Sequence, residues 1–144
     1  MESPLYRELK VWQKAHEVTL NIIALVRDIP DRPAFRAIVQ QIVGSASSIG
    51  ANIAEGSSSR AGKEYIRYLQ IALRSATELD NWIQLFKDSE ELRKYAHIEK
   101  LNAIENANIE VLKMLTRMIQ SLQKKREEEG LSSTIRDIVK EYLP

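Results

Sequence analysis

Apolar residues recur at every third or fourth position through four long segments of this chain, and this helical period limits the folds it can adopt. The segments cover about residues 6–29, 33–56, 60–87 and 97–126. No stretch alternates apolar with polar residues, and no Asn-Gly or Asp-Gly hairpin turn is present, so we expect no strands. The spacing therefore predicts an all-α protein.

The links between the four predicted helices are short. The run Ile29-Pro30-Asp31-Arg32-Pro33 ends the first helix, because a chain with two closely spaced prolines cannot continue one. Three serines at 57–59 separate the second helix from the third. Long helices joined by short links favour an antiparallel up-and-down four-helix bundle. We assign residues 1–126 to this bundle and residues 127–144 to a C-terminal tail that is partly helical.

Several residues mark expected helix ends and contacts. Ser3 and Pro4 predict the start of the first helix, since a hydroxyl can cap it and proline lacks the N–H that would be unsatisfied there. Gly56 is expected in the left-handed position just past the second helix. Gly44 and Gly50 lie inside that helix, where glycine costs about 1 kcal/mol relative to alanine. They indicate either the close approach of another backbone or a local bend.

The predicted core face of the fourth helix contains one polar residue. Its apolar positions step by three and four residues through Leu101, Ile104, Asn108, Val111, Leu115, Met118 and Leu122. An Asn in such a seam commonly sets the register of the helices at some cost in stability. We expect Asn108 to be buried and structural.

A reversal of charge precedes the tail. Lys124-Lys125-Arg126 is followed by Glu127-Glu128-Glu129 and then by Gly130, which we expect to break the helix. Ser132 or Ser133 can cap a short amphipathic helix beyond it. The apolar residues of that helix share one face; they are Ile135, Ile138, Val139, Tyr142 and Leu143. So short a helix is not stable alone in water. Its apolar face must dock on its own bundle, on a neighbouring subunit or on a separate partner, or the tail stays disordered.

Composition excludes many kinds of catalytic site. The chain has no Cys, so disulfides, thiolate zinc sites, iron–sulfur clusters and cysteine nucleophiles are absent. Neither His16 nor His97 has a Glu three residues before it, as the di-metal sites of helical bundles require. A phosphate-binding glycine-rich loop is missing as well. We expect no enzymatic activity, no metal and no cofactor.

The distribution of charge indicates a cytoplasmic protein. The longest run without charge, residues 37–54, is too polar to span a bilayer, and the first ten residues lack the apolar core of a signal peptide. We therefore expect no membrane partner. A net charge of +1 gives no general attraction to nucleic acid. The tail, however, holds two of the 21 basic and five of the 20 acidic residues, so residues 1–126 carry a net charge of +4.

Four cations gather on one side of the third predicted helix. At 100° per residue, an arc of about 60° opposite the core contains Arg60, Lys63, Arg67 and Arg74. Lys10 and Lys14 offer similar charge on the first helix. Two interpretations remain open. The cations form a solvated face paired with Glu64 and Glu78 along the helix, or they bind the phosphates of a nucleic acid.

Three motifs, in this order, resemble the "four helix bundle protein" family. They are Leu9-Lys10-Val11-Trp12-Gln13-Lys14-Ala15, then Ser48-Ile49-Gly50-Ala51-Asn52-Ile53-Ala54-Glu55-Gly56, then Lys63-Glu64-Tyr65-Ile66-Arg67-Tyr68-Leu69 with Ile71-Ala72-Leu73. Members are encoded within intervening sequences of bacterial 23S rRNA genes, and they are related to the accessory variability determinant of diversity-generating retroelements. The likeness covers about residues 6–122, so the tail lies outside it.

The resemblance implies a left-handed up-and-down bundle that assembles as a homopentameric ring and has no enzymatic activity. In the retroelement relatives a basic surface binds nucleic acid and a reverse transcriptase, so RNA or DNA and such a protein are the implied partners. Our hypothesis is nucleic-acid or ribonucleoprotein binding through Arg60, Lys63, Arg67 and Arg74, helped by Lys10 and Lys14. The alternative is a scaffold that recruits a protein partner through its ring surface or its C-terminal helix.

Overall fold

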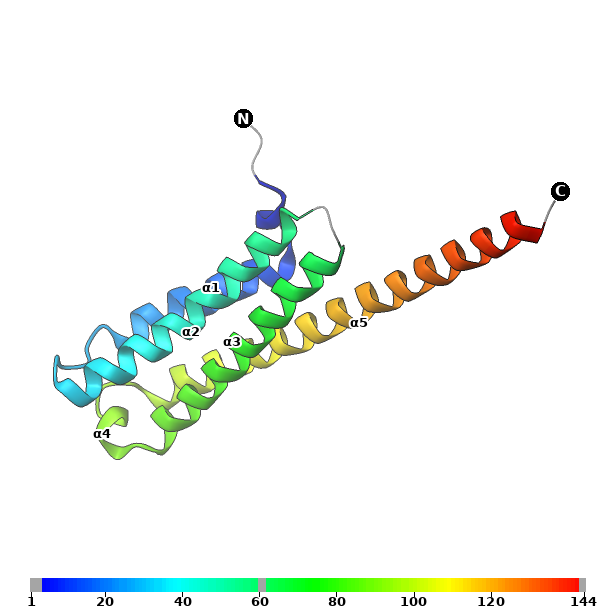
Figure 1. Ribbon diagram of the computed structural model, residues 1–144. Helices are drawn as coiled ribbons and strands as arrows, with labels where there is room; N and C mark the ends of the chain where they lie inside the picture. The colour runs from blue at the N-terminus through cyan, green and yellow to red at the C-terminus, as the bar shows by residue number, and fades with distance from the viewer. Residues whose placement is uncertain (1–3, 60–61, 143–144) are drawn as a thin grey trace.

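Helices make up nearly all of the described chain (Figure 1). The computed structural model describes residues 4–59 and 62–142. Its elements are the 3₁₀ turn η1 (Leu5–Glu8) and the helices α1 (Lys10–Val26), α2 (Pro33–Ser57), α3 (Gly62–Asp88), α4 (Glu90–Arg93) and α5 (Ile98–Tyr142). These residues include no strand, which confirms the all-α prediction.

The four long helices enclose one apolar core. α1 packs against α2 and α5, and α3 packs against the same two helices. The stripe predicted for α2 lies inside, with Ile42, Ala46, Ile49 and Ile53 fully buried and Ile38 partly buried. Burial of a large aliphatic side chain stabilises a fold by about 1.5–3 kcal/mol, so this shared core is what holds the helical bundle together.

α1 is shorter than predicted. The pattern predicted a helix over residues 6–29, but α1 begins at Lys10 and ends at Val26. Leu9 has φ −70° and ψ 123°, an extended conformation that separates η1 from α1. The side chain of Gln13 donates a hydrogen bond to the Arg7 carbonyl at 2.8 Å and stabilises this break. Of the predicted helix start, Ser3 lies outside the described residues.

The expectation for Gly56 is wrong. α2 continues to Ser57, and no glycine of the described residues has a positive φ. Gly56 is buried instead, and a Cβ added there would lie 2.7 Å from Tyr68 Cβ and 3.0 Å from Tyr65 Cδ2. The missing side chain therefore allows α2 to approach α3 closely.

One explanation of Gly44 and Gly50 was that another backbone approaches α2 closely there. The structure shows no such approach at either position. A Cβ at Gly44 would have no atom within 4 Å, and a Cβ at Gly50 would meet only the Trp12 side chain, with Nε1 at 3.4 Å. No neighbouring backbone therefore packs against α2 at either glycine.

Asn108 is fully buried, as the seam predicted. Its Nδ2 donates a hydrogen bond to the Ala76 carbonyl at 2.9 Å and links α5 to α3. Its Oδ1 is buried without a hydrogen-bond partner. An unsatisfied buried acceptor destabilises the folded state, so this residue favours one alignment of the helices at a cost in stability.

A second link between α3 and α5 lies next to the first, on the side nearer to α4. Glu105 accepts hydrogen bonds from Gln84 and from Lys87, whose Nζ lies 3.1 Å from Glu105 Oε1. These bonds, with that from Gln84 the larger cause, hold the pKa of Glu105 below its ordinary value of 4.5. The short helix α4, which was not predicted, follows here and is capped by Ser89, whose Oγ accepts a hydrogen bond from the Leu92 N–H.

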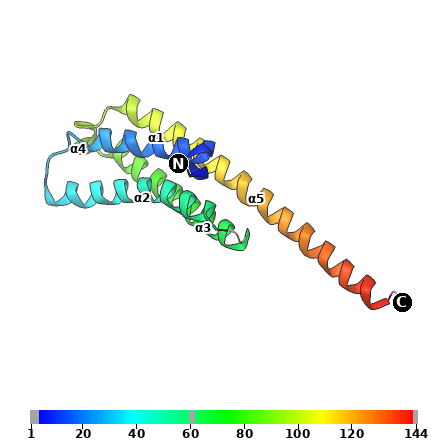
Figure 2. The same ribbon diagram turned by 90° about the horizontal axis from the view of Figure 1, so that it is seen from above.

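The predicted break at Gly130 does not occur. α5 is one helix of 45 residues, and its part beyond Arg126 extends alone away from the other helices in both views (Figures 1 and 2). One glycine costs a helix only about 1 kcal/mol, and the flanking Glu129 and Leu131 are good helix formers. The tail therefore continues α5 and does not dock on its own bundle.

Replacing Gly56 by alanine is expected to lower the free energy of unfolding by about 1–3 kcal/mol, because the new methyl group overpacks the contact between α2 and α3. Gly44→Ala is the matched control, since it makes the same change in the same helix with open space around it. It should raise stability by up to about 1 kcal/mol. Urea unfolding followed by circular dichroism measures both, and equal shifts would contradict the contact at Gly56.

The lowered pKa of Glu105 predicts that the folded protein loses stability in acid. Its pKa is lower in the folded than in the unfolded chain, so its contribution is complete above pH 4.5 and disappears as the pH falls through the folded pKa. Glu105→Gln should cost about 1 kcal/mol at pH 7, and the difference from the wild type should shrink in acid. Unfolding at pH 7 and pH 3 tests this, and a difference independent of pH would argue against the ionised pair.

Candidate nucleic-acid interface

Lys63, Arg67 and Arg74 are exposed on α3, on the side of the helix that faces away from the core. Ile66 and Leu69, which lie between them in sequence, are buried, as the helical period requires. Arg60, the first cation of the predicted set, lies outside the described residues. The structure thus places the three described cations on one accessible helix face.

A groove runs between this face and α5. It has a volume of about 610 Å³ and is lined by Lys63, Glu64, Ile66, Arg67, Gln70 and Arg126. Three of these side chains are cations and one is a carboxylate. Arg126 comes from α5, and its Cδ lies 3.5 Å from the position that a Cβ on Gly62 would take. The groove therefore combines the α3 cations with one that the sequence analysis did not assign to the site.

The carboxylates nearest to these cations have other hydrogen-bond partners. Glu64 accepts a hydrogen bond from Ser59 Oγ at 3.1 Å, and Glu78 accepts one from Trp82 Nε1 at 3.2 Å. Within residues 4–59 and 62–142, no ion pair joins either carboxylate to Arg67 or Arg74. The Arg67 guanidinium instead lies 5.2 Å from the centre of the Tyr68 ring. This arrangement leaves the α3 cations directed to solvent.

Lys10 and Lys14 belong to a different part of the surface. They lie on α1, which packs against α2 and α5. Lys10 is exposed and lines a groove between α1 and α5, whereas Lys14 is half-buried. The structure therefore does not place the two lysines beside the α3 cations.

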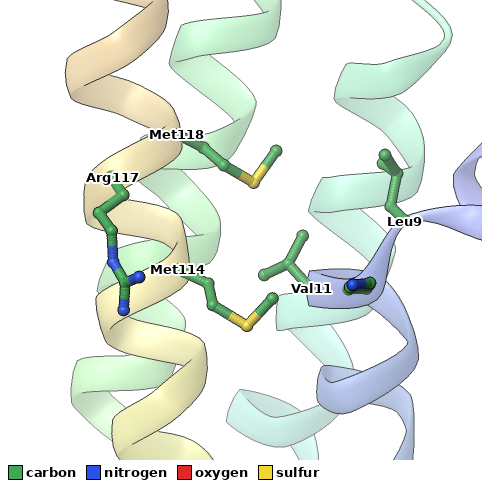
Figure 3. Close-up of a pocket in the computed structure, with 6 residues that line it drawn as sticks. Leu9, Val11, Met114, Arg117 and Met118 are labelled. Atoms are coloured by element: carbon green, nitrogen blue, oxygen red, sulfur yellow. The ribbon is translucent and has the colours of Figure 1, made fainter.

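The groove between α1 and α5 is apolar and has a basic rim. It has a volume of about 250 Å³ and is lined by Leu9, Lys10, Val11, Met114, Arg117 and Met118. Figure 3 shows Met114 and Met118 pointing across it toward Val11 and Leu9, with Arg117 on the outer side of α5. Arg117 also lines a groove beside Tyr65 of α3, so it lies between the two groups of cations. The sequence analysis missed Arg117. The only indication that Arg117 lies beside the bundle was its position directly before Met118, a residue of the core face.

The histidines do not form a metal site. His16 stacks on Trp12 with ring centroids 4.6 Å apart, beside a groove between α1 and α2. No group of three or more His, Asp or Glu residues in the described chain could hold a metal ion. None of the helices in that part of the chain is both long and apolar enough to cross a membrane.

The model of the 23S rRNA-intervening sequence protein family matches residues 7–117. The chain belongs to this family. A solved relative, a protein of unknown function from the S23 ribosomal protein family of Bacteroides thetaiotaomicron, is 30% identical and superposes with a TM-score of 0.67. The match covers 76% of this chain and 97% of that chain. No curated protein matches.

The family match confirms the resemblance and covers most of the bundle. Lys63, Arg67 and Arg74 lie within the matched residues, as do Lys10 and Arg117. Arg126 and the projecting part of α5 lie beyond them. The α3 cations thus lie in the part of the chain that the family model covers, whereas Arg126 and the projecting part of α5 lie outside it.

Proposed function

We propose that this protein is a non-enzymatic helical bundle that binds RNA or DNA, free or within a ribonucleoprotein, through the cations of α3. The observation that carries the proposal is the groove where Lys63 and Arg67 lie with Arg126 of α5. The nearby carboxylates Glu64 and Glu78 are hydrogen-bonded elsewhere. The cations are therefore available for phosphates.

The spacing of the cations suits a phosphate backbone better than base edges. Lys63 and Arg67 are one helical turn apart, and Arg74 follows two turns later, so the face extends for about 16 Å at 1.5 Å per residue. Arg binds phosphate through paired N–H groups, and Lys does so as a point charge. Such contacts fix position and carry no sequence information. We expect binding with little base discrimination and a strong dependence on salt.

The proposed assembly follows from the family resemblance. We expect an antiparallel, left-handed bundle that forms a homopentameric ring in the cytoplasm. Short links and the packing of each long helix against two others support the bundle topology. Residues 1–126 of each copy carry a net charge of +4, so several copies would present a strong combined field. Several weak sites on one assembly also bind a long nucleic acid more tightly than one site alone.

A scaffold function is the second candidate. The exposed apolar residues of the projecting part of α5 favour it, because Leu131 and Ile135 are 63% and 52% exposed. In that case the helix would recruit a protein partner, such as a reverse transcriptase, and the α3 cations would be a solvated surface.

Reversing the α3 charges separates the two functions. Lys63→Glu, Arg67→Glu and Arg74→Glu together should lower the affinity for a structured RNA and for duplex DNA at least tenfold without changing assembly. Fluorescence anisotropy measures the affinity at about 50 and 200 mM salt. Three phosphate contacts predict a loss of about 40-fold for the wild type between these concentrations.

A matched control reverses three exposed cations at the other end of the bundle. Arg93→Glu, Lys94→Glu and Lys100→Glu change the net charge equally. Affinity should fall much less in this control than in the α3 variant. Equal losses would show a general charge effect, and no binding by the wild type at 50 mM salt would overturn the proposed function.

A further inference from the structure

The projecting part of α5 carries a row of large apolar side chains in contact with water. Leu131, Ile135, Ile138 and Val139 are 63%, 52%, 50% and 44% exposed. They recur at helical spacing and so lie on one face. An apolar face of this length on an otherwise polar helix indicates a binding surface.

The bundle of the same chain cannot cover this face. At 100° per residue, it lies about 160° around the helix axis from the seam that α5 buries in the core. Both views also show this part of α5 leaving the other helices without bending back (Figures 1 and 2). The occupant must therefore be another molecule.

The charges between the seam and the apolar face identify that molecule. Lys124 and Lys125 are followed, one turn later, by Glu128 and Glu129, and all four are exposed. Arg126 between them faces the α3 groove. Among the described residues no ion pair joins the lysines to the glutamates. Lys125 and Glu128 lie near the middle of the face that these charges share, so a second copy of α5 running antiparallel would place the Lys125 of each copy opposite the Glu128 of the other.

The same register brings apolar side chains together. If the pair is centred between Arg126 and Glu127, Lys125 faces Glu128 of the second copy, and Lys124 and Glu129 flank this contact on its two sides. Moving outward from this centre, Ile135 of one copy lies beside Met118 of the other, and Val139 lies beside Met114. The two methionines line the apolar groove between α1 and α5 (Figure 3).

We propose that α5 pairs antiparallel with α5 of a second copy, so that the tail of each lies along the methionine-lined groove of the other. Methionine side chains adapt to the surface that packs on them, and two ion pairs at the centre, Lys125 of each copy with Glu128 of the other, select the antiparallel register. The family match ends at residue 117, so the pairing uses a part of the chain beyond the family pattern. Because the contact is two-fold, it joins copies of two different rings and not neighbours within one ring. It goes beyond the proposed nucleic-acid binding and leaves the exposed face of α3 free.

Charge reversal in the full chain tests the pairing. Lys124→Glu with Lys125→Glu makes the block acidic throughout, and Glu128→Lys with Glu129→Lys makes it basic throughout. Each variant should lose the α5 pair, and an equimolar mixture of the two should restore it. All four positions are exposed, so folding should be unaffected. Circular dichroism checks this for each variant.

Cysteine cross-linking reads the register directly, because the natural chain has no Cys. Met114→Cys mixed with Val139→Cys should form a disulfide-linked dimer on mild oxidation, since a disulfide requires Cα atoms within about 7 Å. Thr116→Cys mixed with Val139→Cys is the matched control, because Thr116 lies two residues from Met114 along α5 but on another side of the helix. It should cross-link at least fivefold less.

Combining the two tests makes the outcome decisive. With the cysteines in place, the all-acidic or the all-basic block should reduce cross-linking at least fivefold, and pairing one block with the other should restore it. Absence of the Met114–Val139 cross-link, equal cross-linking of the Thr116 control, or cross-linking unaffected by the blocks would each overturn the proposal. No nucleic acid is present in this experiment, so its failure leaves the α3 surface untested and the proposed function intact.

Discussion

Burial of one apolar stripe from each long helix against its two neighbouring helices determines where everything else in this structure can lie. The stripe of α2 cannot be buried alone, and its contact with α3 is so close that Gly56 has no room for a Cβ. Once α3 is held at this distance, its buried side is occupied by residues such as Leu69 and Ile83, and its charged residues must face water. The position of the candidate interface is therefore a consequence of the core.

The two polar links between α3 and α5 have different effects on the same packing. Asn108 is buried and leaves one acceptor unsatisfied, so it favours a single alignment and lowers stability. Glu105 lies nearer the surface, where Gln84 and Lys87 satisfy its carboxylate. The first link selects a register, and the second stabilises it. Together they align α5 with α3, so that Arg126 of α5 comes to line the same groove as Lys63.

The sequence predicts those parts of the structure that follow from the helical period of its apolar residues. Helical spacing identified the four long helices, the α2 stripe and the burial of Asn108, because each follows from which side of a helix a residue occupies. It did not predict the contact at Gly56, since close packing depends on the distance between two helices. It also placed a break at Gly130, because the weak preference of one glycine was counted without the helix formers around it. Of the candidate site, it found the α3 cations but missed Arg117 and Arg126, which join the site only through packing.

The charges of the tail bear on both proposed surfaces at once. Residues 127–144 hold five acidic and two basic residues, whereas residues 1–126 have an excess of four cations. An antiparallel α5 pair would place residues 127–129 of one copy beside residues 124–126 of the other, whereas the segment that reaches the methionine-lined groove carries Arg136, Asp137, Lys140 and Glu141 and has no net charge. Positive potential would then fall around the middle of α5, and the tail would cover the groove beside α1. The potential would remain on α3, whose cations the pair does not cover. Pairing through α5 would thus restrict the approach of a nucleic acid to the α3 side, and one helix would both join two copies and select the face that binds.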